Sequence, residues 1–138
     1  MSFAAAGALQ EAAYQALSAS TELDALVEGR VFDTSPPGDG SSGASGVYVL
    51  IGDERARPWG AQGLQGAEHE LEVTVVCPEQ SFAAAKAAAG AVSDAMLGQM
   101  PALSEGRIAT SAFAGARTRR TTDGGRRIAL RFRYRVEL

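Results

Sequence analysis

Residues 126–138 read RRIALRFRYRVEL, a run in which apolar and charged side chains alternate. Successive side chains of a β-strand point to opposite faces of the sheet, so this pattern predicts a strand with one buried face and one arginine-rich face. The side chains expected on the buried face are Ile128, Leu130, Phe132, Tyr134, Val136 and Leu138. Those expected on the other face are Arg127, Ala129, Arg131, Arg133, Arg135 and Glu137.

A turn signal precedes this strand at Thr122-Asp123-Gly124-Gly125. The Asp-Gly pair readily adopts the positive backbone angles of a tight hairpin turn. The partner strand runs back from Arg120 toward Ile108, and it carries Arg117 and Arg119. The sequence therefore predicts a C-terminal β-hairpin.

Two helices are predicted ahead of the hairpin. The first covers residues 3–18, with Ser2 as its cap, and a short helical turn follows and ends at Gly29. The second covers residues 82–99 and is rich in alanine, which suits close packing on a sheet. The inner stripe of the first helix is expected to contain Ala6, Leu9, Ala13 and Leu17.

Strands are predicted at residues 30–33, 47–51 and 68–77, separated by two loops rich in glycine. The loops cover residues 34–46 and 52–67 and are expected to be flexible, because they lack apolar anchors. We expect them to contact other proteins, with Trp59 as the apolar anchor of the second loop. The fold class follows as α+β, a mostly antiparallel sheet with two helices packed on one face.

Length and composition limit the possibilities. With 138 residues the chain is expected to form a single domain, residues 1–138, with a hydrophobic core. The one cysteine, Cys77, excludes an internal disulfide and a cysteine metal cluster. No signal peptide and no apolar run of about 20 residues is found, so a soluble protein without membrane contact is expected.

Candidate chemical groups are few. His69 stands between Glu68 and Glu70, but neighbours in a strand point to opposite faces, so we expect an exposed or loop-packing histidine. Cys77 is expected to fill the core. The glycine clusters lack the strand-to-helix context and the Lys-Ser/Thr end of a phosphate loop. We therefore expect no catalytic residue, no metal and no cofactor.

The charges are unevenly distributed. Residues 107–138 contain nine arginines against only Asp123 and Glu137, so the rest of the chain is strongly acidic. The arginine face of the C-terminal hairpin has three interpretations: a subunit interface, a solvated face or a nucleic-acid surface. The nucleic-acid interpretation usually involves interleaved aromatic side chains, whereas Phe132 and Tyr134 are expected to point the other way.

The order of these segments resembles that of the tail completion proteins, or tail terminators, of long-tailed bacteriophages and gene transfer agents. The resemblance covers nearly the whole chain. It rests on Glu28-Gly29-Arg30-Val31-Phe32-Asp33 followed by Pro36-Pro37, on Ile51-Gly52-Asp53-Glu54, on Leu71-Glu72-Val73-Thr74-Val75, on the alanine-rich helix and on the hairpin. The Ser/Gly-filled residues 38–46 depart from the family pattern.

The resemblance implies a structural assembly protein rather than an enzyme. It implies a homo-oligomeric ring, a hexamer, that ends the tail tube and binds the tail tube protein and the head–tail connector or stopper. DNA would be only cargo passing through the ring. The protein would be made in the bacterial cytoplasm and would reside at the head–tail junction of a virion or virus-like particle. The alternative is a nucleic-acid-binding module that uses the arginine-rich hairpin.

We predict that the interface residues are Arg131, Arg133, Arg135, Glu70, Glu72, Arg55, Arg57 and Trp59. The glutamates and the β-strand arginines would meet either as neighbours within one sheet or across a subunit boundary. We favour the subunit boundary, because stacked arginines on one face would otherwise repel each other.

Overall fold

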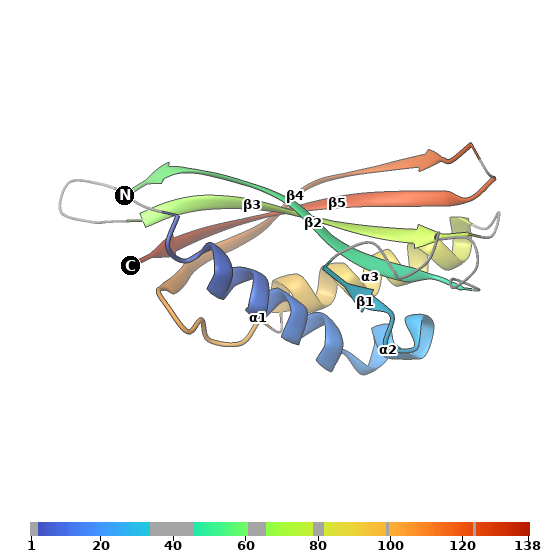
Figure 1. The fold of residues 1–138 in the computed structure, drawn as a ribbon, viewed down its shortest axis with the longest axis horizontal. Coiled ribbons are helices and arrows are strands. Elements are labelled where there is room, and N and C mark those ends of the chain that lie inside the picture. Colours follow the sequence, from blue (N-terminus) through green and yellow to red (C-terminus); the bar gives the residue numbers. More distant parts are fainter. Residues whose placement is uncertain (1–2, 34–45, 61–65, 79–81, 99, 123) are drawn as a thin grey trace.

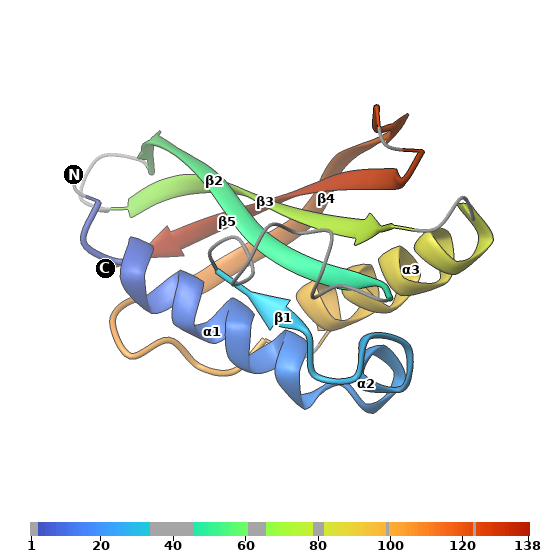
Figure 2. The same cartoon turned by 45° about the vertical axis from the view of Figure 1, so that its right-hand side comes forward.

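The computed structural model describes residues 3–33, 46–60, 66–78, 82–98, 100–122 and 124–138. Helices lie on one side of a twisted five-stranded sheet with the order β1-β2-β3-β5-β4, as Figures 1 and 2 show. The elements are α1 (Ala6–Ala19), α2 (Thr21–Val27), β1 (Val31–Phe32), β2 (Tyr48–Trp59), β3 (Gly66–Cys77), α3 (Phe82–Gly98), β4 (Arg107–Arg120) and β5 (Arg126–Glu137). Only the β1–β2 pair is parallel, so the expected α+β class is confirmed.

The expected apolar face of β5 forms the centre of the core. Ile128, Leu130, Phe132, Tyr134 and Val136 are all buried, whereas Leu138 lies beyond the end of the strand and is 48% exposed. The hydroxyl of Tyr134 donates a hydrogen bond to the carbonyl oxygen of Met96 in α3, at 2.8 Å. Burial raises the pKa of Tyr134. This strand therefore ties the sheet to the helix layer.

The helix α1 packs through the expected stripe, since Ala6, Leu9, Ala13 and Leu17 are buried. The helix begins at Ala6 rather than at Phe3, because residues 3–5 form a turn closed by the amide of Ala6 and the carbonyl oxygen of Phe3. The expected cap, Ser2, lies outside the described residues.

The short helix α2 has a well-defined start and end. The hydroxyl of Ser20 accepts a hydrogen bond from the amide of Leu23, at 3.1 Å, and so caps the first turn. At the other end Glu28 and Gly29 both adopt positive φ angles, of 51° and 78°. The sequence had placed the end of this helix at Gly29; the helix ends at Val27, and Glu28 caps it in the left-handed conformation just before Gly29.

The predicted loop at residues 52–67 is wrong for most of its length. The strand β2 continues through residues 52–59, and β3 already begins at Gly66. The strand continues because Arg55 and Arg57 pair with Glu70 and Glu68 across β3, so polar residues occupy strand positions. Most of the other predicted loop, residues 34–45, lies outside the described residues.

The strand β4 is an edge of the sheet and is exposed along most of its length. Its pairing with β5 is interrupted by irregularities between Ile108 and Thr110 and between Phe113 and Gly115. Gly115 has a φ of 150°, which L side chains rarely adopt. The bulge at Gly115 shapes the charged face described next.

Candidate functional site

The sheet face that points away from the helices, called the outer face below, collects every interface residue that the sequence predicted. Directly paired residues of neighbouring strands point to the same side. The register places Arg55, Glu70 and Arg133 in one row across β2, β3 and β5, and Glu72 opposite Arg131. The next row contains Arg57, Glu68 and Arg135, and Trp59 lies at the end of β2.

The acidic and basic residues of the outer face meet inside one chain. Glu70 and Glu72 are direct cross-strand partners of Arg133 and Arg131, because β3 and β5 are adjacent in the sheet. A guanidinium nitrogen of Arg131 also lies 3.5 Å from a carboxylate oxygen of Glu70. The favoured expectation, that these groups meet across a subunit boundary, is therefore wrong. Their role as interface residues stays a prediction.

Glu68 forms the centre of the charge network, a role that the sequence reasoning missed. Its carboxylate accepts hydrogen bonds from Nε of Arg57 at 2.6 Å and from Nε of Arg135 at 3.0 Å. Nε of Arg133 lies 3.8 Å away. Burial alone would raise the pKa of Glu68, but the bonds to Arg135 and Arg57 and the charges of Arg57 and Arg133 outweigh it and lower the pKa.

The sequence contains one indication of this role, because alternation places Glu68 on the same face of its strand as Glu70 and Glu72. Trp59, expected in a loop, lies in β2 instead. Its ring packs against the backbone of its partner Gly66, and the guanidinium of Arg135 lies 5.6 Å from the ring centroid. The network and this stacking together cover the β2 side of the outer face. Below, we call these two rows, Arg57-Glu68-Arg135 and Arg55-Glu70-Arg133, the compensated half.

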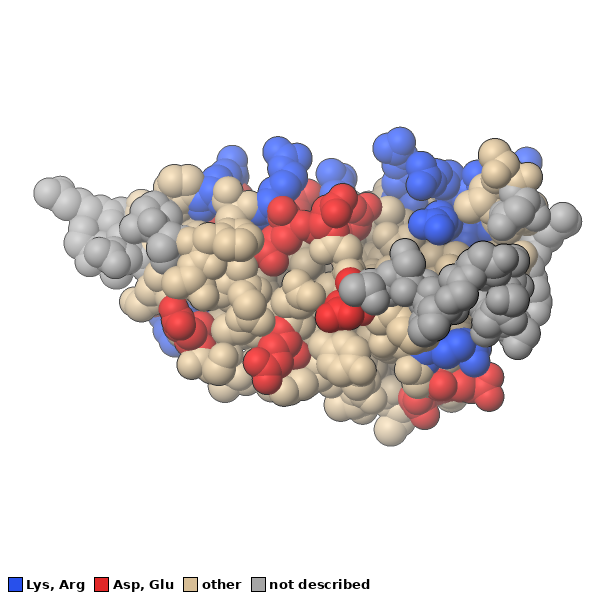
Figure 3. All heavy atoms as spheres, in the orientation of Figure 1, with Lys and Arg blue, Asp and Glu red and all other residues tan. Residues whose placement is uncertain are grey.

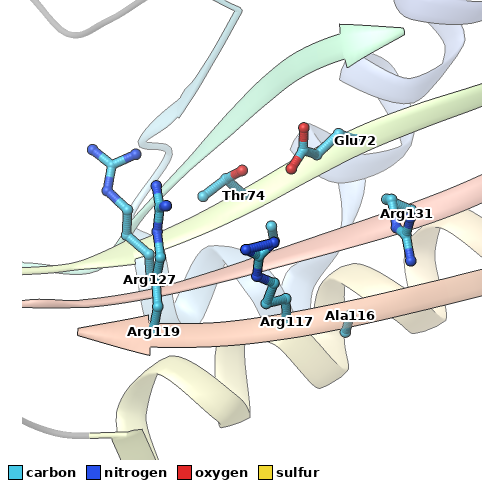
Figure 4. Close-up of a pocket in the computed structure, with 8 residues that line it drawn as sticks. Glu72, Thr74, Ala116, Arg117, Arg119, Arg127 and Arg131 are labelled. Atoms are coloured by element: carbon cyan, nitrogen blue, oxygen red, sulfur yellow. The ribbon is translucent and has the colours of Figure 1, made fainter. Parts of the chain in front are cut away.

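The opposite half of the outer face carries a groove of about 340 Å³ between β3, β5 and β4. Its floor includes two alanines, and its polar lining contains Glu72, Thr74, Arg117, Arg119, Arg127 and Arg131. We call it the arginine groove. Figure 4 shows its side chains, and the register makes Arg119 and Arg127 direct partners across the strands. Like charges in such positions repel each other.

No ion pair involves Arg117, Arg119 or Arg127 within the described ranges. Gly115 leaves space for Arg131: a Cβ atom at Gly115 would lie 2.6 Å from Nη2 of Arg131. The bulge of β4 therefore leaves room for this guanidinium at the rim of the groove. The groove offers several forked cationic donors and a single carboxylate, which is the composition of an anion-binding surface.

His69 lies on the opposite face and is fully buried, so the expectation of an exposed histidine is wrong. Its Nδ1 lies 2.5 Å from a carboxylate oxygen of Glu54, whose side chain is 10% exposed. Nε2 has no hydrogen-bond partner. The expectation failed because Glu54 lies in the part of β2 that had been predicted as a loop. The pair joins β2 to β3 inside the fold.

Among the described residues, no group of three His, Cys, Asp or Glu side chains is placed to hold a metal ion. Cys77 is buried in the core, as expected. None of the described helices is both long and apolar enough to span a membrane. The chemistry that the site does offer is the recognition of anionic groups by arginine.

Comparisons with known proteins point to one family. The family model of the tail completion protein gp17 matches residues 11–137. Among solved structures, a chain from the virion of a native gene transfer agent particle is 43% identical, with a TM-score of 0.88. The match covers 99% of this chain and 100% of that chain. The likeness therefore extends over nearly the whole fold. No match was found among curated proteins.

Proposed function

The chain belongs to the family of tail completion proteins, and from this premise we propose that it forms a homo-oligomeric ring that ends a tail tube and joins it to the head connector. As a member of this family the chain is a structural tail protein of a phage-like particle and resides in the virion. Six copies form the proposed ring, in line with the resemblance in the sequence.

The observation that carries this proposal is the likeness over full length to one chain of an assembled particle. The 43% identity extends over 99% of this chain and the whole of that one, so the likeness is not confined to a shared motif. The fold supports the proposal as well. Its chemical features are charged surfaces, and among the described residues no metal-ligand cluster accompanies them. Surfaces of this kind serve binding to other proteins.

The proposed partners are further copies of the chain, the tail tube protein and the head–tail connector or stopper. DNA passes through the ring as cargo. A second candidate, a nucleic-acid-binding module, is favoured by the arginine groove alone. The ion pairs of Glu68 and Glu70 oppose it, because the arginines that they contact are already engaged by carboxylates of the same chain.

Light scattering coupled to size exclusion tests the ring, together with electron microscopy of assembled particles. We expect a closed ring of identical copies at the end of the tail tube. A single copy per particle would contradict the proposal. Repeating the chromatography with a DNA duplex at low and high salt tests the alternative, since phosphate binding weakens steeply with salt.

A further inference from the structure

The two halves of the outer face differ in charge balance. In the compensated half, Glu68 alone contacts three arginines, and Glu70 pairs with Arg131 at the edge of the groove. In the arginine groove, Arg119 and Arg127 are direct cross-strand partners of like charge, and within the described chain neither forms an ion pair. Such a pair destabilises the sheet of an isolated subunit. An external anion bound in the groove would offset this repulsion.

The shape of the groove favours carboxylates as that anion. Arg131 lies at one end, where Gly115 leaves room for it, and Arg119 and Arg127 lie together at the other. Guanidinium groups bind both carboxylates and phosphates through two parallel hydrogen bonds, so the rest of the lining decides between them. Glu72 limits the groove on the β3 side and would repel the continuous phosphates of a nucleic acid. A short acidic segment therefore matches the groove between its two arginine ends better than a nucleic acid does.

The chain carries such a segment on its opposite side. Within residues 22–33, Glu22, Asp24, Glu28 and Asp33 are exposed, and Arg30 is the only basic residue. Of these carboxylates only Glu28 has an ion-pair partner, Arg30, within the described chain. Leu26 of the same helix is 38% exposed. At the hairpin end of Figure 3, basic side chains lie over the sheet and acidic ones lie below, over α2.

We propose that the arginine groove of one copy binds the acidic α2 segment of the next copy. The basic and acidic surfaces lie on opposite layers of the fold, so the contact joins unlike surfaces, head to tail. A contact of this type generates a ring when its rotation closes. The inference rests on the proposed ring and adds which surfaces join its subunits.

The variant Arg119→Glu tests the contact in the full-length chain. We expect the dissociation constant between copies, measured by sedimentation velocity, to rise at least about tenfold. The matched control is Arg120→Glu, since Arg120 is exposed on the same strand but pairs with Arg126 on the other face. The double variant Arg119→Glu with Glu22→Arg should regain assembly, because each copy of a ring contributes both surfaces. Failure of that rescue, or an equal loss in the control, overturns the contact.

Crosslinking within assembled particles provides the second measurement. Copies with Arg119→Cys and Glu22→Cys should become linked to each other by a short bis-maleimide, and the native Cys77 is buried and does not compete. Rings that form without this crosslink, and that tolerate Arg119→Glu, overturn the inference and leave the ring intact. A single copy per particle overturns both. If Arg119→Glu leaves assembly unchanged and abolishes binding of a DNA duplex, the groove binds nucleic acid and the inference fails.

Discussion

The substitution His69→Phe should destabilise the fold strongly, although the sequence alone suggested that this position tolerates change. In the structure His69 is fully buried and its Nδ1 lies 2.5 Å from a carboxylate oxygen of Glu54. Removing the imidazole leaves that carboxylate nearly buried and without this partner. Breaking one side of a buried pair costs about 3–5 kcal/mol. For a domain of this size the melting temperature should fall by about 9–15 °C, at roughly 3 °C per kcal/mol.

A double-mutant cycle tests the cause of that loss by thermal unfolding. Glu54→Met should cost about 1–3 kcal/mol, because it leaves Nδ1 of His69 without an acceptor. The double variant, with both partners replaced by apolar side chains of similar size, should be more stable than His69→Phe alone. Glu105→Met at an exposed position is the control and should stay within about 0.5 kcal/mol of the wild type. A His69→Phe variant that melts within about 2 °C of the wild type would refute the reasoning.

Three further predictions concern the backbone, the charge network and a helix cap. Gly115→Ala should destabilise the fold by roughly 1–2 kcal/mol, because Gly115 has a φ of 150°. Gly90→Ala should instead stabilise the fold by about 0.5–1 kcal/mol, because Gly90 lies in a helix with open space around it. Urea unfolding measures both changes. Glu68→Gln should be less stable than the wild type at neutral pH. Because the folded-state pKa of Glu68 is lowered, the difference should shrink as the pH falls below about 4 and through that lowered pKa, and a difference that grows in acid would contradict the assignment. Ser20→Ala should cost about 1 kcal/mol of cap energy, and Ser18→Ala, at an exposed site, much less.

Alternation made the strands with an apolar face predictable. The inner residues of β5 and the buried stripe of α1 were identified because apolar residues that are buried on one side recur at a regular spacing in the sequence. The half of β2 from Gly52 to Trp59 left no such period. Its outer positions are arginines that pair with glutamates of β3, and its inner positions include Glu54, which pairs with His69. Polar residues satisfied by distant partners look like a loop when only the sequence is known.

The interface residues illustrate a related difficulty. The alternation of side chains placed Glu70 and Glu72 on the outward face of one strand, and Arg131 and Arg133 on the outward face of a second strand. Both assignments agree with the structure. Parity cannot give strand order, however, and β5 inserts between β3 and β4 although α3 and β4 separate it from β3 in the sequence. Adjacent or separate strands would give the same alternation. Only the order of the strands decides whether those charges balance each other or remain available to a neighbour.

Strand order also changes which arginine can report on assembly. A reversal of charge at Arg133 would place a carboxylate beside Glu68 and opposite Glu70, so it would disturb the compensated half within the same subunit. Loss of assembly in that variant could then arise from a damaged sheet. Arg119 is exposed and has no ion-pair partner in the described chain, and its cross-strand neighbour is Arg127. The reversal Arg119→Glu removes a repulsion inside the subunit, so the subunit should melt no lower than the wild type. A loss of assembly together with an unchanged or raised melting temperature would then be due to the surface between copies.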